Sequence, residues 1–197
     1  MKTKNRRGLA EGSSQDVLGP LQDLIRQVRS GVRTKQQLVD FNEGRNPFEK
    51  KVASENGFPV RVNYDLSVES LVAQGKYDWK NDSINSKNFQ TSRKGEATLN
   101  LELVHFNQVL TSEEVIAELK KRGLRPAELH ELLSFGVQYP EEQRRHPIVA
   151  LASVCQSWSG CRFVPYLWVV DNERRLYFDY FDDRWYENYR FLAVCES

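Results

Sequence analysis

Two short helices that follow one another directly, with strand patterns on both sides, constrain the fold of this chain more than any other feature. In residues 111–123, TSEEVIAELKKRG, Thr111 and Glu114 form a capping box, and a glycine closes the helix. Pro126 lies at or near the first turn of the next predicted helix, which Gly136 closes. Helices that interrupt a run of strands in this way predict an α+β protein.

The strand patterns lie on both sides of these helices. In residues 98–106, TLNLELVHF, leucines alternate with polar side chains, so one face of the strand is expected to be buried and the other exposed to solvent. Residues 148–154, IVALASV, are nearly all apolar, which is typical of a strand buried on both faces. Pro165 within RFVPYLWVV predicts an edge strand or a bulge. Two further strands are expected in RLYFDYFD (175–182) and YRFLAVC (189–195).

These patterns divide the chain into four predicted parts. Residues 1–14 are expected to be a disordered tail, and residues 15–48 a helical hairpin. Residues 49–97 are expected to be a linker that contains a short strand (PVRVNYD), a helix (from SVESL) and a long polar loop. Residues 98–197 are expected to form the α+β domain, a mixed or antiparallel sheet with the two adjacent helices.

Charge argues against a general attraction to nucleic acids or anionic membranes. The net charge is +1, from 28 Lys and Arg against 27 Asp and Glu. Residues 1–51 nevertheless carry a local excess of five positive charges. This segment is either a basic arm that binds nucleic acid or a partner, or a solvated helix face. Only two aromatic residues, Phe41 and Phe48, lie in this segment, too few to interleave its charges as stacking platforms, which favours the solvated face.

Cysteine content and hydropathy predict a reduced, cytoplasmic protein. Three cysteines are too few, and odd in number, for a disulfide framework, although one bridge with a spare thiol stays open. No run approaches the roughly 18 apolar residues that a membrane span needs. The basic start, MKTKNRRGLAEGSSQ, lacks the apolar region of a signal peptide.

The sequence contains no pattern that identifies a catalytic or metal site, and no cofactor is expected. P-loop, Rossmann and GxSxG fingerprints are absent, and the three histidines have no metal-ligand spacing. Cys155 with His130 or His146 is a conceivable nucleophile pair without a local signature. Cys155 and Cys161 are spaced outside a zinc knuckle. The acids near residues 179–187 match no calcium loop, so a solvated acidic loop is expected.

The most informative stretch for function is the aromatic segment RRLYFDYFDDRWYENYRFLAV, residues 174–194. It has two interpretations, a sheet core with a capping loop or a binding surface. Aromatic side chains with polar tips give a large contact area at small entropic cost, which suits recognition. The candidate binding residues are Trp168, Tyr177, Trp185, Tyr186 and Tyr189.

Two stretches resemble a group of bacterial proteins that are frequent in candidate-phylum genomes. They are LQDLIRQVRSG…TKQQLVDF…RNPF (21–48) and ELVHFNQVLTSEEVIAELKKRGLRPAELHELLSFGVQYP…IVALAS…RFLAV (102–194). This resemblance implies no particular activity. The order of strand, two helices and strands ending in RFLAV also resembles C-type-lectin-like folds, including the variable ligand-binding proteins of diversity-generating retroelements. Their Gly- and Trp-rich signatures and paired cysteines are missing here, so the resemblance implies only a non-catalytic binding module.

Three functional hypotheses follow from these observations. The first is a non-catalytic binding protein that presents the aromatic residues near the C-terminus to a protein or another macromolecular ligand. The second is a nucleic-acid-associated protein of a mobile element or defence system that uses the basic N-terminal helices. The third is a hydrolase with a site that no motif reveals, because the separation of paired carboxylates is a three-dimensional quantity.

Overall fold

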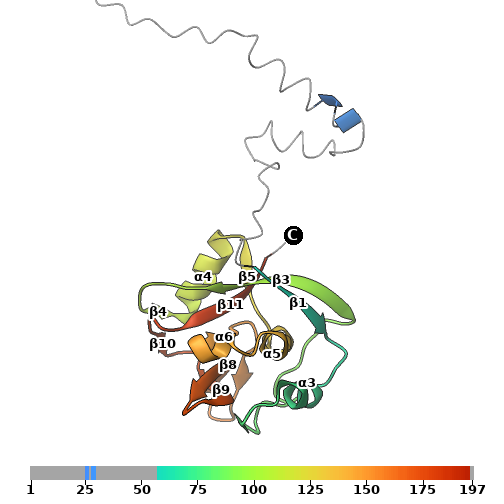
Figure 1. The fold of residues 1–197 in the computed structure, drawn as a ribbon. Coiled ribbons are helices and arrows are strands. Elements are labelled where there is room, and N and C mark those ends of the chain that lie inside the picture. The colour runs from blue at the N-terminus through green and yellow to red at the C-terminus, as the bar shows by residue number, and fades with distance from the viewer. Residues whose placement is uncertain (1–24, 27, 30–56, 196–197) are drawn as a thin grey trace, which may run out of the picture. The chain divides into compact units, whose positions relative to one another are not determined.

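The computed structural model describes residues 25–26, 28–29 and 57–195 (Figure 1). The chain divides into two compact units, residues 1–52 and 53–197. Residues 25–26 and 28–29 are helical, and the rest of the predicted tail and helical hairpin lies outside the described residues.

The second unit is α+β, as the sequence predicts, and is built on a mixed sheet with the path β1-β3-β11-β6-β8-β9-β2. The pairs β11–β6 and β2–β9 are parallel, and the other pairs are antiparallel. Its strands are β1 (Phe58–Asn63), β2 (Trp79–Lys80), β3 (Glu96–Val104), β5 (Leu124–Pro126), β6 (Ile148–Val149), β7 (Cys155–Gln156), β8 (Arg162–Val170), β9 (Glu173–Tyr180) and β11 (Arg190–Cys195). A small second sheet pairs β4 (Leu110–Thr111) with β10 (Arg184–Trp185). The helices are α3 (Val68–Gly75), α4 (Ser112–Lys121), α5 (Leu129–Gln138) and α6 (Glu142–Arg145).

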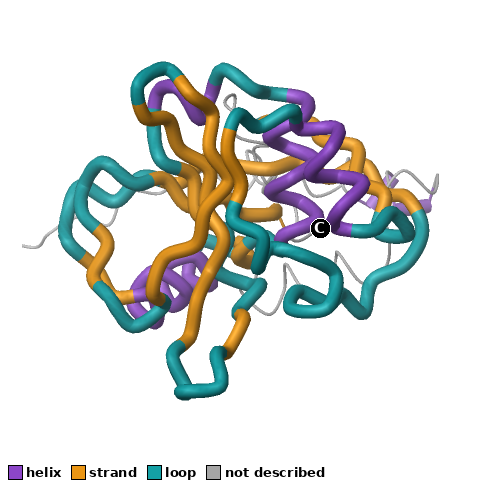
Figure 2. Tube along the Cα trace, turned by 90° about the horizontal axis from the view of Figure 1, so that it is seen from below, coloured by secondary structure: helices purple, strands orange, loops and turns teal. Residues whose placement is uncertain are grey.

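The sheet separates two hydrophobic cores, and β11 contributes to both. Leu192 and Val194 belong to the core that α3 and α5 cover, whereas Phe191 and Ala193 belong to the core under α4. Alternate residues of a strand point to opposite faces, so the two cores lie on opposite sides of the sheet. Figure 2 shows helices on both sides of the strands.

Local sequence signals are confirmed where they are strongest. The α4 capping box is present in full, with Thr111 and Glu114 each accepting a backbone N–H of the other. Gly123 has a φ of 69°, which suits the glycine that follows the helix. Ser67 caps α3 through the N–H of Ser70. These elements form where they were expected because a few adjacent residues determine them.

Four sequence predictions differ from the structure. Residues 58–97 are not a linker, because β1 pairs with β3 along its whole length and α3 contacts α5. Pro126 ends β5 instead of starting a helix, and α5 begins at Leu129. Of residues 148–154, only Ile148 and Val149 form a strand. Pro165 predicted an edge strand or a bulge, but its strand, β8, lies inside the sheet. On one side of β8 two short strands pair with it and leave Pro165 unpaired: β6 pairs with residues 166–167 and β7 with residues 162–163.

The outer edge of β1 is closed by side chains of α5. The backbone N–H of Arg61 donates to Gln138 Oε1 at 3.1 Å, and Gln138 Nε2 donates to the Arg61 carbonyl at 2.9 Å. The Tyr139 hydroxyl donates to the carbonyl of Pro59. The glutamine amide thus occupies the position of a neighbouring strand, which protects an edge that could otherwise pair with another chain.

A buried arginine joins β9 to three helices. Arg174 donates to the carbonyls of Gly75 and Gly136, both at 2.8 Å, and to Gln143 Oε1 at 3.1 Å. Its guanidinium also lies 5.1 Å from the ring centre of Tyr77. Because the two glycine carbonyls lie near the ends of α3 and α5, the cation is placed where the negative ends of helix dipoles stabilise it.

Tyr77 supports a prediction about the contact between α3 and α5. Its hydroxyl is buried without a hydrogen-bond partner in the described structure, and a Cβ on Gly136 would lie 2.5 Å from it and 2.9 Å from Leu167 Cδ1. Gly136→Ala should therefore lower the free energy of unfolding by about 1–3 kcal/mol, because the extra methyl overpacks the contact. Tyr77→Phe alone should leave it unchanged or raise it slightly, since a buried unpaired hydroxyl is removed.

The double variant tests the cause. Gly136→Ala should cost less in the Tyr77→Phe background than in the wild type when unfolding in urea is followed by circular dichroism. An equal cost in both backgrounds would show that the Tyr77 hydroxyl does not limit the space at Gly136.

Candidate functional site

Five aromatic rings form a continuous group on one face of the sheet, which we call the aromatic surface. Its members come from β2, β8, β9 and the loop before β11, and they are Trp79, Tyr166, Trp168, Tyr177 and Tyr189. The β8–β9 register places Tyr166 opposite Tyr177 and Trp168 opposite Arg175. Parallel pairing of β2 places Trp79 beside Arg175, so the rings of three strands share one face.

The rings are in mutual contact. Trp79 and Tyr177 are stacked with centroids 4.9 Å apart. Tyr166 links them to the other members, with centroids 6.1 Å from Tyr177, 6.1 Å from Trp168 and 6.4 Å from Tyr189. These separations fall within the range in which aromatic pairs attract each other.

The aromatic surface is exposed because the elements that cover this side of the sheet lie elsewhere. Helix α4 packs against β5 and β4, toward the other end of the sheet. Trp79 keeps 40% and Tyr177 38% of its surface accessible, whereas Trp168 and Tyr189 are half-buried and Tyr166 is buried. Two large aromatic side chains that stack in water on an open sheet face are typical of recognition surfaces.

Asp179 lies beside the tyrosines of this surface. It is two residues beyond Tyr177 on the same face of β9, and it interacts with the Tyr189 hydroxyl. The Tyr180 N–H donates to its Oδ1 at 2.9 Å. Burial raises the pKa of the Asp179 carboxyl, and the nearby Asp183 adds to the increase. Burial likewise raises the pKa of Tyr166 and of Tyr189, with Asp179 adding to both.

Among the described residues, no lysine or arginine forms an ion pair with Asp179. Arg175, on the same face, pairs with Glu173 at 2.8 Å. Arg162 pairs with Asp182 and with Glu113. The carboxylate of Asp179 is therefore a negative charge that this part of the protein leaves without a cation.

The structure separates the five residues that the sequence analysis selected. Tyr177 and Tyr186 are exposed, the latter with 65% of its surface accessible, and Trp168 and Tyr189 are half-buried. Trp185 is only 3% exposed and belongs to the core under α4. It cannot contact a ligand at the surface, because its indole N–H donates to Ser112 Oγ at 2.8 Å inside that core.

Sequence reasoning missed three members of the site. Trp79 belongs to a strand of two residues within a region expected to be a linker, so no local pattern marks it as part of a sheet. Tyr166 was expected only as part of a strand. Asp179 was included in the strand predicted for residues 175–182 but also counted among the acids of a solvated loop, and it was not chosen as a site residue; it lies on β9 and is partly buried. The alternation of 175–182 does give a signal, because it puts Asp179 on the same face as Tyr177.

The opposite face of the sheet carries a second exposed aromatic group. Phe163 and Phe178 lie 4.7 Å apart and line a hollow of about 500 Å³, together with Phe89 and Cys155. Trp158, in the turn between β7 and β8, also lines it and is fully exposed. The ring of Trp158 makes no ring contact among the described residues, so it differs from the rings of the aromatic surface, which contact one another.

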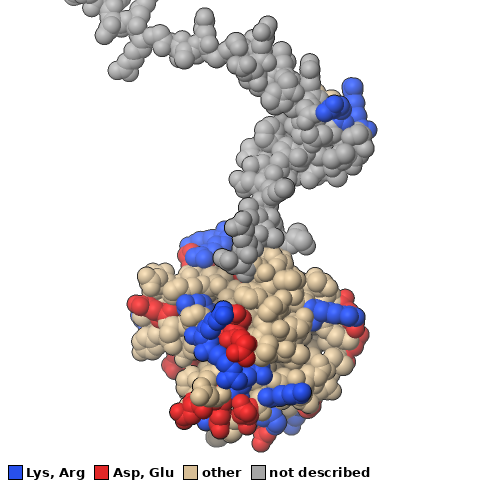
Figure 3. All heavy atoms as spheres, in the orientation of Figure 1, with Lys and Arg blue, Asp and Glu red and all other residues tan. Residues whose placement is uncertain are grey.

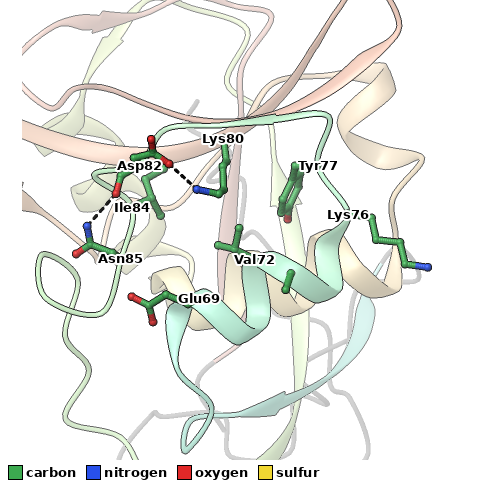
Figure 4. Close-up of a pocket in the computed structure, with 9 residues that line it drawn as sticks. Glu69, Val72, Lys76, Tyr77, Lys80, Asp82, Ile84 and Asn85 are labelled. Carbon is green, nitrogen blue, oxygen red and sulfur yellow. Dashed lines mark hydrogen bonds and ion pairs between the residues drawn. The ribbon is translucent and has the colours of Figure 1, made fainter.

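A third candidate is the pocket of about 400 Å³ beside α3, shown in Figure 4. Its charged side chains already have partners within the protein. Lys80 points toward Asp82 and lies 2.5 Å from it, and Glu69 accepts the Ser86 hydroxyl and N–H. These hydrogen bonds lower the pKa of Glu69 to about 2. Lys76 points away from the pocket in Figure 4, so no unpaired charge converges on it.

Basic and acidic side chains are interspersed on the face drawn in Figure 3. Around α6, for example, Arg144 pairs with Glu141 and Arg145 with Glu142. Within residues 57–195, this face shows no extended basic area of the kind that contacts many phosphates. The basic arm of the nucleic-acid hypothesis lies outside the described residues and stays a prediction.

The arrangement of cysteines and histidines does not indicate a catalytic or metal centre. Burial raises the pKa of the Cys155 thiol, which is opposite to the change that activates a nucleophile. His130 Nε2 bonds the carbonyl of Leu66 at 3.1 Å. Within residues 57–195 and the four residues described before them, no group of three or more His, Cys, Asp or Glu could hold a metal ion. No helix in the described part is long and apolar enough to cross a membrane.

Comparisons of the chain with protein-family models, with curated proteins and with solved structures find no match. The resemblances to bacterial candidate-phylum proteins and to C-type-lectin-like folds therefore stay predictions.

Proposed function

We propose that this protein is a non-catalytic binding module and that the aromatic surface contacts its ligand. The observation that carries the proposal is the stacked pair Trp79–Tyr177, which stays exposed to water on the same side of the sheet as α4 but away from the strands that α4 contacts. Burying these rings inside the protein would stabilise the fold by about 25 cal/mol for each Å² of apolar area removed from water. A ligand that covers the rings would bury the same apolar area on binding.

Several features of the surface suit a macromolecular ligand. Rings on neighbouring strands have fixed spacing, so little side-chain entropy is lost when a partner covers them. Tyrosine and tryptophan are enriched among the residues that dominate binding energy. The surface is also open, as expected for contact with another chain, whereas small molecules prefer concave pockets.

A displayed library of linear peptides, panned against the immobilised protein, tests the proposal. We expect enriched peptides to bind the wild type and to lose about tenfold or more of their affinity for the double variant Trp79→Ser with Tyr177→Ser. Trp158→Ser is the matched control, because it removes an exposed tryptophan from the opposite face, and it should leave binding unchanged.

The same experiment can overturn the proposal. If Trp158→Ser abolishes binding and the double variant retains it, the hollow beside Phe163 is the binding site. If no peptide is enriched over an unrelated immobilised protein, the aromatic surface does not recognise polypeptide segments.

A further inference from the structure

The aromatic surface contains one charge that distinguishes it from a purely apolar patch. Asp179 is partly buried beside Tyr166 and Tyr189, two residues from Tyr177 on the same face of β9, and no basic side chain of the described structure forms an ion pair with it. A carboxylate in such surroundings loses part of its hydration, and a cation brought by a ligand would restore the lost interaction. A positive charge from outside this part of the chain would therefore stabilise the Asp179 carboxylate.

From this geometry we infer that the ligand is a protein segment that inserts an arginine side chain between the tyrosine rings to pair with Asp179. The inference rests on the proposed function and specifies the chemistry of its ligand. A guanidinium group matches the site in two ways: its planar fork binds a carboxylate through two parallel N–H···O bonds, and its faces stack on aromatic rings. The protein already uses this contact elsewhere, with Arg162 lying 4.2 Å from the ring centre of Phe181.

Charge decides against the other macromolecule that aromatic sheet faces commonly bind. Single-stranded nucleic acids stack bases on such rings, but they also need a positively charged groove for the phosphates. Here Asp179, with Asp183 nearby, is a negative charge that forms no ion pair in the described structure, while Arg175 is paired with Glu173. Phosphates would be repelled near Asp179, and a basic side chain would be attracted.

Lysine would also be attracted, but less specifically. An ammonium group is a compact, strongly hydrated charge that cannot bind both carboxylate oxygens in a plane or stack as a flat group. The site therefore predicts a preference for arginine over lysine in otherwise identical segments.

Nuclear magnetic resonance with short peptides tests the inference. The probes are three acetylated, amidated peptides, Gly-Ser-Xaa-Ser-Gly, in which Xaa is arginine, lysine or the uncharged arginine analogue citrulline. The readout is the set of four tryptophan indole N–H signals of the ¹⁵N-labelled full chain, assigned by single Trp→Phe substitutions. We expect the arginine peptide to shift the Trp79 and Trp168 signals and to leave the Trp158 signal on the opposite face unchanged.

Asp179→Asn is the test variant, because it keeps the shape of the side chain and its acceptor for the Tyr180 N–H. It should weaken binding of the arginine peptide at least tenfold, to about the level of the citrulline peptide, on the usual strength of charge-assisted hydrogen bonds. Asp171→Asn is the matched control: it removes an equal charge from the exposed β8–β9 turn and should not change binding.

The inference is overturned if the arginine and citrulline peptides bind equally, if Asp179→Asn binds as the wild type does, or if the Trp158 signal moves in place of Trp79. It is also overturned if an oligo(dT) or oligo(U) strand shifts the Trp79 signal and none of the peptides does. The proposed function is tested separately by panning. Enriched peptides that need Trp79 and Tyr177 but bind Asp179→Asn normally would support that function and contradict a role for arginine.

Discussion

Replacing Arg174 with methionine should lower the free energy of unfolding by about 3–5 kcal/mol, the scale of a broken buried polar network. The substitution leaves the carbonyls of Gly75 and Gly136 and the amide of Gln143 without their donor. Each buried acceptor that loses its partner costs about 1–3 kcal/mol. Methionine fills much of the volume, so the loss reports on hydrogen bonding more than on a cavity.

Arg175→Met is the matched control for this prediction. Its guanidinium pairs with the exposed Glu173, and exposed ion pairs contribute about 0–1 kcal/mol. Urea unfolding of both variants at equal protein concentration provides the comparison. Equal losses in Arg174→Met and Arg175→Met would show that the contacts between Arg174 and the helices do not stabilise the fold.

The second large effect is expected at Trp185. Trp185→Ala should cost about 3–5 kcal/mol, the usual range for a buried tryptophan, because it opens a cavity beneath Tyr189 and Phe191. It also breaks a hydrogen-bond chain in which the indole donates to Ser112 Oγ and that hydroxyl donates to the carbonyl of Phe181. The adjacent Tyr186→Ala should change stability by about 0.5 kcal/mol or less, as exposed positions do.

Thermal unfolding separates these two variants directly. If Trp185→Ala is as stable as Tyr186→Ala, Trp185 is not the core residue that the structure describes. It would then again be a candidate for contact with the ligand. If Tyr186→Ala unfolds the protein, the loop before β11 has a structural role that its exposure does not suggest.

The contrast between Trp185 and Tyr186 shows what sequence can predict about this site. Aromatic content alone marks residues 174–194 as important, and it cannot tell a core residue from a surface residue. The indole N–H of Trp185 donates to Ser112, 73 residues earlier in the chain. Alternation along one strand is a local pattern, so the shared face of Tyr177 and Asp179 could be predicted. A contact between residues as far apart in the sequence as Ser112 and Trp185 could not.

The same distinction applies to the fold. The capping box of α4 and the alternation in β3 depend on a few neighbouring residues, and both are confirmed. The two-residue strand β2 exists because Asp78 and the backbone after it bond to β9, 96 residues further along. Trp79, a central member of the aromatic surface, therefore has no local signal. The boundary expected near residue 98 is not a break in the fold, for the same reason: the strand predicted at PVRVNYD does form, as β1, but its pairing with β3 has no local signal.

The free energy of unfolding of the double variant Trp79→Ser with Tyr177→Ser tests most directly whether these rings are free to serve a ligand. Their stacking contributes about 0.5–1.5 kcal/mol beyond the area they cover, and both side chains already face water. We expect the variant to stay folded and to lose less than about 2 kcal/mol, well below the loss expected for a buried tryptophan. A loss as large as that of Trp185→Ala would mean that the pair holds the sheet together, and it would contradict a surface reserved for binding.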